Sequence, residues 1–275
     1  MTTSSELLGL ALDVAEQAGQ HVVTRRQGHI DVAATKSTDN DVVTEVDRES
    51  EAMIFDLLHS ARPGDGFFGE EGQTGESTSG ITWVVDPIDG TVNFLYGIPH
   101  YAVSIAAVEG PPRPDEWNVL AGVVFNPATG EMFHASAGAG AHLGKRPLAV
   151  APPVPLENAL WLTGFAYSET YRRDQGALTA ALVPLVRDIR RMGTASLDLA
   201  AIAAGRGDIY FERTLSPWDH AAGELLVREA GGVVTGFGEE APGREAIFAG
   251  HQGVVEAFKK LVSSHGGDTP LAEIN

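Results

Sequence analysis

The chain has 275 residues, 43% hydrophobic and 20% charged, which is enough for one large or two modest globular domains. A net charge of −18 argues against a nucleic-acid partner, and an anionic substrate would require bound cations to offset the repulsion. The sequence contains no cysteine, which excludes disulfides, zinc–thiolate sites and thiol nucleophiles.

No apolar stretch reaches membrane-spanning length. Acidic residues at Glu6, Asp13 and Glu16 occupy the region where a signal peptide would carry basic residues. We therefore expect a soluble cytoplasmic protein with no membrane partner.

The first predicted elements are two helices. Thr3-Ser4-Ser5-Glu6 has the capping-box pattern, and apolar residues follow at helical spacing as far as Val22. A polar loop over 36–41 then leads to a second helix that starts near Thr44. In the simplest interpretation Asp47 is a first-turn acid that complements the helix dipole.

A short apolar strand over 66–69 ends in the paired acids Glu70 and Glu71. Adjacent carboxylates on an exposed loop are usually just solvated. Here a second strand that also ends in acids follows closely, so the two strands could present carboxylates at one edge of a sheet.

That second strand, Trp83-Val84-Val85, leads directly into Asp86-Pro87-Ile88-Asp89-Gly90-Thr91. Pro87 fixes φ and Gly90 permits a backbone conformation closed to other residues, so a turn here can aim both carboxylates at one point. Two carboxylates held that close repel each other unless a cation lies between them, and oxygen ligands favour a hard divalent cation. The alternative is an ordinary Asp-Pro and Asp-Gly turn with solvated acids.

Beyond this segment, strands over 98–107, 119–125 and 131–135 predict a meander. The glycine-rich stretch 138–144 lacks the phosphate-loop pattern and predicts a tight hairpin. His134 and His142 are expected to have no part in the chemistry.

The proline-rich stretch 151–155 predicts a boundary between an N-terminal α+β domain, 1–150, and a C-terminal α/β domain, 151–275. After it, strands over 160–163, 188–192 and 208–211 alternate with helices over 174–186 and 197–204. Ser216, Pro217 and Asp219 then have the pattern of the N-cap, N1 and N3 positions of a helix over 221–230. Asp219 would serve there as a cap.

Four motifs resemble those of the inositol monophosphatase family, the magnesium-dependent, lithium-sensitive sugar and inositol phosphatases. The Asp86–Thr91 segment is similar to the family's metal-binding signature. Trp218-Asp219 before Ala-Ala-Gly, with Glu-Ala-Gly-Gly at 229–232, is similar to its second signature. Gly69-Glu70-Glu71, and Thr44 with Asp47 after a lysine-bearing loop, match two further segments. The resemblance extends from Lys36 to Gly232.

The resemblance implies a five-layered αβαβα sandwich, the sugar phosphatase fold, with the site in a cleft between two domains. It implies hydrolysis of inositol monophosphate to inositol and phosphate by in-line attack of a metal-activated water. Mg²⁺ would be the cofactor, Li⁺ an inhibitor, a small phosphate monoester the partner and a homodimer the assembly.

The resemblance also assigns roles to residues. One Mg²⁺ would be held by Glu70, Asp86 and the Ile88 carbonyl, a second by Asp86, Asp89 and Asp219, and a weaker third ion near Glu70. Asp47, Glu70 and Thr91 would be catalytic. The implied substrate contacts are Asp89, Gly90, Thr91, Gly193, Thr194, Ala195 and Glu212.

Alternatives remain for the substrate and for the class of function. Histidinol phosphate, a nucleotide 3′-phosphate or a sugar bisphosphate could replace inositol phosphate, and a regulatory module could keep the metal site without turnover. Glu212 could instead be a surface acid paired with Arg213. The segment Thr163–Tyr167 stands where some relatives carry a serine near the ring, which weakens a strict preference for inositol.

Overall fold

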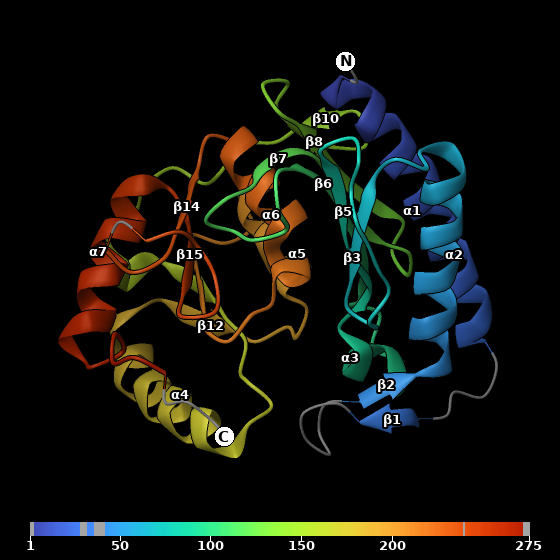
Figure 1. Ribbon diagram of the computed structural model, residues 1–275. Coiled ribbons are helices and arrows are strands. Elements are labelled where there is room, and N and C mark those ends of the chain that lie inside the picture. The colour runs from blue at the N-terminus through green and yellow to red at the C-terminus, as the bar shows by residue number, and fades with distance from the viewer. Residues whose placement is uncertain (1–2, 28–31, 36–41, 239, 272–275) are drawn as a thin grey trace.

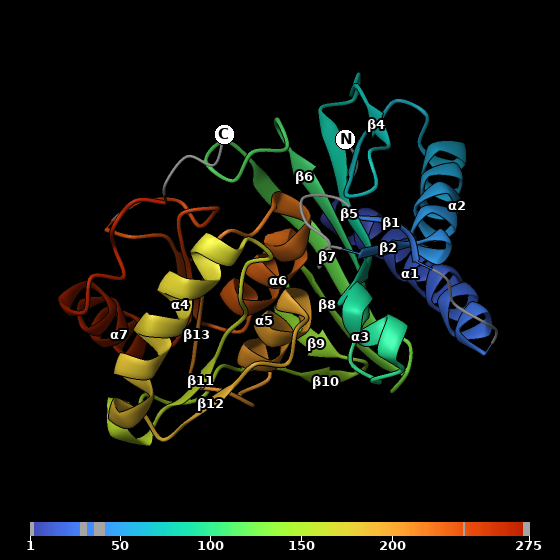
Figure 2. The ribbon, with the colours of Figure 1, turned by 90° about the horizontal axis from the view of Figure 1, so that it is seen from below.

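The computed structural model describes residues 3–27, 32–35, 42–238 and 240–271. Its main elements stack as five layers, with helices outside and between two sheets (Figure 1). The view from below shows the same layers, with α5 and α6 between the two sheets (Figure 2). The predicted αβαβα sandwich is confirmed. The lysine-bearing loop over 36–41 lies outside the described residues.

The outer helical layer on one side consists of α1 (Ser4–Arg26) and α2 (Glu45–Ala61). The capping box predicted at Thr3 with Glu6 begins α1. The helix start predicted at Thr44 is also a capping box, in which Asp47 accepts from the Thr44 N–H. A small antiparallel pair, β1 (Val32–Thr35) and β2 (Val42–Thr44), connects the two helices.

The larger sheet has eight strands in the order β10-β9-β8-β7-β6-β5-β3-β4. Its central strand β5 is buried along its whole length, with Trp83 and Val85 in the core beneath α1 and α2 and Val84 in the core on the opposite face. Burial on both faces explains why its sequence is a continuous apolar run. The strands are β3 (Gly66–Gly69), β4 (Thr74–Gly75), β5 (Ile81–Asp89), β6 (Ala102–Glu109), β7 (Asn118–Asn126), β8 (Glu131–Ser136), β9 (Ala141–Leu143) and β10 (Arg146–Pro147).

The middle layer consists of α5 (Ala195–Ala203) and α6 (Pro217–Glu229), which come from the C-terminal half of the chain. One core cluster joins these helices to residues of both sheets. The helix α6 lies so close to β7 that a Cβ on Gly122 would lie 3.0 Å from Ala222 Cα. A glycine there permits the approach of helix and strand.

The smaller sheet has five strands in the order β12-β11-β13-β15-β14. Its other face is covered by α4 (Glu169–Leu182) and α7 (Gln252–Ser264), which enclose a separate core around Trp161 and Phe258. The strands are β11 (Leu160–Leu162), β12 (Asp188–Arg190), β13 (Ile209–Glu212), β14 (Val233–Thr235) and β15 (Ile247–Gly250), with short 3₁₀ helices at Leu156–Asn158 and Val183–Leu185.

The predicted helix over 174–186 has wrong bounds. It begins at Glu169, after Ser168 as N-cap, and it ends at Leu182. Pro184 then lies in a 3₁₀ turn, because proline cannot supply the backbone donor that a helix interior requires.

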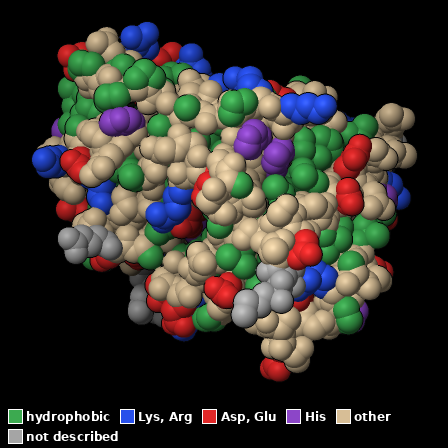
Figure 3. All heavy atoms as spheres, turned by 90° about the horizontal axis from the view of Figure 1, so that it is seen from above, with side chains coloured by type: hydrophobic (Ala, Val, Ile, Leu, Met, Phe, Trp, Pro, Cys, Tyr) green, Lys and Arg blue, Asp and Glu red, His purple; other side chains and the backbone are tan. Residues whose placement is uncertain are grey.

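Acidic and basic side chains are interspersed on the face shown in Figure 3. Within the part of the chain that the structure describes, we find no helix with the length and apolar character needed to cross a membrane.

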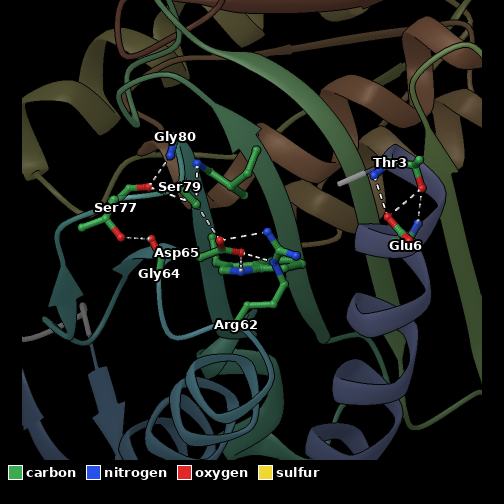
Figure 4. Close-up of polar contacts among 11 residues, drawn as sticks. Thr3, Glu6, Arg62, Gly64, Asp65, Ser77, Ser79 and Gly80 are labelled. Carbon is green, nitrogen blue, oxygen red and sulfur yellow. Dashed lines mark hydrogen bonds and ion pairs between the residues drawn. The ribbon is translucent and has the colours of Figure 1, made fainter. Parts of the chain in front are cut away.

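An ion pair with a buried carboxylate holds the first residues of β3 and β5 in place. It lies at the opposite end of these two strands from the acids Glu70, Asp86 and Asp89. The Asp65 carboxylate accepts hydrogen bonds from the Arg62 guanidinium, from Ser79 Oγ at 2.6 Å and from Trp83 Nε1 at 3.0 Å (Figure 4). The Asp65 side chain is only 1% exposed. Removing the carboxylate would leave the indole N–H and a guanidinium without their acceptor.

We expect Asp65→Ala to lower the free energy of unfolding by about 3 kcal/mol, because a buried carboxylate is lost and the buried Trp83 indole N–H is left without its acceptor. Thr3→Ala is the control: it removes an exposed cap and should cost about 1 kcal/mol. Urea titrations followed by circular dichroism measure both. Equal losses in the two variants would show that the Asp65 network adds nothing beyond an exposed hydrogen bond.

Candidate active site

A cavity of about 530 Å³ lies where the two halves of the chain meet. The larger sheet contributes the end of β5 to its lining, and the C-terminal half contributes the segments before α4, α5 and α6. The acidic residues that line it are Glu70, Asp86, Asp89, Glu212 and Asp219. Residues separated by up to 149 positions in the sequence thus face one space.

The segment between Asp86 and Asp89 is a bulge within β5 and not the turn we predicted. Asp86 pairs with Ser104 of β6 and Asp89 with Ala102, so three steps on one strand oppose two on the other. In a regular strand, residues three apart point to opposite faces. The extra residue of the bulge brings the Asp86 and Asp89 side chains to the same face, and both carboxylates line the cavity. Pro87 is tolerated because a bulge leaves residues outside the ladder.

Backbone N–H groups hold these two carboxylates in place. Asp86 Oδ1 accepts from the Ile88 N–H at 3.0 Å, and Asp89 Oδ2 accepts from the Ser196 N–H at 2.7 Å. The second bond crosses from the larger sheet to α5. Gly90 follows with φ of 90°, a left-handed conformation, and a Cβ on it would lie 2.4 Å from Thr194 Oγ1.

Asp47 and Asp219 each occupy the N3 position of a capping box, as predicted. Asp219 Oδ2 accepts from the Ser216 N–H at 2.7 Å while the residue also lines the cavity. Asp47 Oδ2 accepts from the Thr44 N–H at 2.9 Å, and its Oδ1 accepts from Thr91 Oγ1 at 3.1 Å. Asp47 itself is fully buried and does not line the cavity, so one of its oxygens serves the cap and the other binds Thr91, which does line the cavity.

Glu70 lies on a loop that a buried glutamate holds from behind. The Glu51 carboxylate, on α2, accepts from the Glu71 N–H at 2.7 Å and from the Gln73 N–H at 2.9 Å. Gly69 permits this contact, because a Cβ there would lie 2.3 Å from Glu51 Oε2. The sequence reasoning missed Glu51, although its spacing of four residues from Asp47 places it one helical turn further along α2.

Burial, together with repulsion from neighbouring acids, raises the pKa of four aspartates at or beside the cavity. Burial is the largest cause for Asp86 and Asp219, followed by the charge of Glu70, and both pKa values lie well above the ordinary range. Burial raises the pKa of Asp89 to about 6, against hydrogen bonds from Ser196. Burial also raises the pKa of Asp47, to about 7.

The donor chemistry of this cluster fits a hard divalent cation. Carboxylate and carbonyl oxygens are the ligands such ions prefer, and a cation would relieve the repulsion that raises these pKa values. Among the described residues, however, no group of three or more acidic or histidine side chains is already arranged as a metal site. Asp86, Asp89 and Asp219 each direct one oxygen to a backbone N–H, which fixes the orientation of the carboxylate.

The predicted substrate residues line the same cavity. Thr194 Oγ1 donates to the His100 carbonyl at 2.9 Å, so this side chain is occupied in joining the two halves. The Glu212 carboxylate accepts from Tyr210 Oη at 2.7 Å and contacts Gly164, where a Cβ would lie 2.1 Å from Glu212 Oε1. Burial raises the pKa of Glu212 to about 7.

Glu212 is therefore not the surface acid of the alternative interpretation, since it is 8% exposed. Arg213 pairs with Glu245 instead, and it also donates to the Gly267 and Thr269 carbonyls. The histidines expected to be bystanders, His134 and His142, stack on each other and are not among the residues that line the cavity.

Comparison with known proteins gives consistent results. A model of the inositol monophosphatase family matches residues 3–266. The inositol-1-monophosphatase of Mycobacterium leprae is 42% identical over 250 residues, covering 86% of this chain and 84% of that protein. The Nus factor SuhB of Vibrio cholerae is 38% identical over 84% of this chain and 85% of its own. The crystal structure of extragenic suppressor protein suhB from Bartonella henselae superposes with a TM-score of 0.84 at 36% identity, covering 92% of this chain and 97% of that one.

We expect Glu51→Ala to raise the Mg²⁺ concentration needed to stabilise the protein by about tenfold, because the loop that carries Glu70 loses its anchor. Glu51→Gln keeps an oxygen that accepts from the loop, so it should raise this Mg²⁺ concentration less. Glu45→Ala, an exposed acid on the same helix, is the control. Thermal melts across a Mg²⁺ titration measure all three, and an unchanged midpoint in Glu51→Ala would rule out the anchoring role.

The metal-free protein should lose stability as the pH rises. The pKa of Asp47 is about 7 in the folded state against an ordinary 3.8, and that of Glu212 is about 7 against 4.5. The folded state thus holds protons that the unfolded state has released, and this stabilisation is present at low pH and lost as the pH rises through 7.

In EDTA, the melting temperature should fall between pH 5 and pH 8 by on the order of 5 °C, and Glu212→Gln should reduce that fall. Melts of wild type and variant at each pH test this. A melting temperature that rises over the same interval would contradict the buried-acid assignment.

Proposed function

Because the chain belongs to the inositol monophosphatase family, we propose that it is a Mg²⁺-dependent phosphomonoesterase that hydrolyses inositol monophosphate to inositol and phosphate. One observation carries this proposal. Glu70, Asp86, Asp89 and Asp219 line one cavity beside the hydrogen-bonded pair of Thr91 and Asp47.

We assign Glu70, Asp86 and the Ile88 carbonyl to one Mg²⁺, and Asp86, Asp89 and Asp219 to a second, with a weaker third ion near Glu70. When bound, Mg²⁺ supplies positive charge that lowers the pKa of water and stabilises the leaving oxygen. Asp86 would belong to both ligand sets. The charges of Glu70, Asp89 and Asp219 all raise its pKa.

Thr91 and Asp47 position the attacking water in this proposal. Thr91 Oγ1 lies 3.1 Å from both Asp47 Oδ1 and the Ile88 carbonyl oxygen. With its single proton donated to either of these acceptors, its lone pairs are available to accept from a water in the cavity. Asp47 has a pKa of about 7, which suits a group that takes up a proton near neutral pH. The N–H groups of Gly90 and Thr91 would hold phosphate oxygens.

The alcohol part of the ester would lie against Glu212 and the segment Gly193 to Ala195, with Asp89 at the phosphate end. A carboxylate can accept hydrogen bonds from two neighbouring hydroxyls, which suits a polyol. Histidinol phosphate, a nucleotide 3′-phosphate and a sugar bisphosphate are the alternative substrates within the same chemistry. Inhibition by Li⁺, a cytoplasmic location and a homodimer belong to the same proposal through the family resemblance.

A second candidate function is that of a regulatory module without turnover. The observation that favours this second candidate is the name of the Vibrio cholerae relative, Nus factor SuhB. Release of phosphate from an ester in the presence of Mg²⁺ distinguishes the enzyme from the module, and a panel of inositol, histidinol, nucleotide and sugar phosphates distinguishes the substrates.

Asp89→Asn should lower kcat for inositol monophosphate by about a hundredfold or more, because a charged ligand is lost from the site. In EDTA the variant should melt at the wild-type temperature or higher, since one repelling charge is gone while an oxygen remains for the Ser196 N–H. The rise in melting temperature on adding Mg²⁺ should shrink.

The control is Asp115→Asn, which removes an exposed acid outside the cavity and should change neither property. Full activity of the wild-type protein in excess EDTA would refute the Mg²⁺-dependent mechanism. A wild-type melting temperature indifferent to Mg²⁺ would refute the clustered carboxylate site.

A further inference from the structure

Two arginines line the cavity and have no part in the mechanism above. Arg191 lies just after β12, and Arg244 lies on the segment between β14 and β15. Among the described residues that line the cavity, they are the only basic ones. Both side chains are exposed to solvent.

The backbone around each arginine is fixed. A Cβ on Gly193 would lie 2.5 Å from Arg191 Nη1, so this guanidinium lies directly against Gly193. The Arg244 carbonyl accepts from the Thr214 N–H at 2.7 Å, which ties its segment to the residues just after Glu212. Arg191 thus lies against the Gly193–Ala195 segment, and the segment of Arg244 is tied to the chain two residues after Glu212.

Neither guanidinium makes a hydrogen bond or ion pair to another described residue, whereas neighbouring arginines do. Arg190 pairs with Asp188, and Arg213 pairs with Glu245. Arg191 is close enough to Glu212 to lower its pKa, so it is in part a counter-ion of that acid. Arg244 is not among the charges that shift the pKa of Glu212, and a counter-ion role therefore does not account for it.

We propose that Arg191 and Arg244 bind a second anionic group, a phosphate or a carboxylate, of a substrate whose scissile phosphate lies at the carboxylate cluster. Guanidinium groups bind such groups with two parallel hydrogen bonds, and a neutral polyol would leave both forks to water. A cavity of about 530 Å³ has the size of a small-molecule site. This inference rests on the proposed phosphatase chemistry. Within it, the inference favours phosphate esters that carry a second anionic group, such as a sugar bisphosphate, over inositol monophosphate.

Three hexitol esters that differ at one end test the inference: glucitol 6-phosphate, 6-phosphogluconate and glucitol 1,6-bisphosphate. The wild-type kcat/KM should be about tenfold higher for one or both of the esters with a second anionic group. Arg191→Ala and Arg244→Ala should each lower kcat/KM about tenfold for the preferred ester and less than about twofold for glucitol 6-phosphate. Preference for the bisphosphate identifies phosphate as the second group, and preference for the gluconate identifies carboxylate.

Arg187→Ala is the matched control, because Arg187 is an exposed arginine near β12 that does not line the cavity. It should leave all three rates unchanged. Equal losses on all three esters in the Arg191 and Arg244 variants, or no wild-type preference, would overturn the inference while leaving the phosphatase proposal intact.

Calorimetric binding of the same esters to Asp47→Asn in Mg²⁺, with and without each arginine change, gives a readout free of turnover. If the wild-type protein released no phosphate from any ester, the proposed function would fail. An arginine-dependent preference in binding would then still support the second anionic site, and its absence would reject that site too.

Discussion

Repulsion among buried carboxylates is the interaction on which the rest of the structure depends. Asp86, Asp89 and Asp219 come from two halves of the chain. The charge of Asp89 raises the pKa of both Asp86 and Asp219, and the charge of Asp219 raises that of Asp86. Exposed acids would avoid this cost, so the fold must hold these side chains in place against their own charge. It does so with backbone N–H donors, which stabilise a carboxylate without bringing a competing cation into the cavity.

The same donors also build the scaffold. Asp47 and Asp219 satisfy the first turns of α2 and α6 with one oxygen. Asp219 also lines the cavity, and Asp47 reaches it through its hydrogen bond from Thr91. Asp89 binds the Ser196 N–H in the first turn of α5 and so fastens the larger sheet to the middle layer. Structural and chemical roles are therefore not alternatives for these residues. A helix cap fixes a carboxylate within a few tenths of an ångström, which is also what a binding site requires.

The sequence was sufficient for features that depend on local rules. The capping box at Thr3 and the helix starts at Thr44 and Ser216 follow from short-range hydrogen bonding, and the structure confirms all three. The αβαβα architecture followed from a family resemblance. The bulge between Asp86 and Asp89 could not be predicted, because it is defined by pairing with β6. Glu51, Ser196 and Arg244 were missed for a related reason: their partners lie at least 20 residues away in the sequence.

The shared middle layer has a consequence for synthesis of the chain. The eight-stranded sheet is complete at Pro147, but one of its faces is covered by α6, which ends at Glu229. At roughly 5–20 residues per second, translation of the intervening 80 or so residues takes about 4–16 s. During that interval the first half of the nascent chain carries an uncovered apolar surface of Val84, Ala106 and Val124. Transiently exposed apolar surface of this kind is prone to aggregation, so the order of layers in this fold sets a period during which the nascent chain is vulnerable.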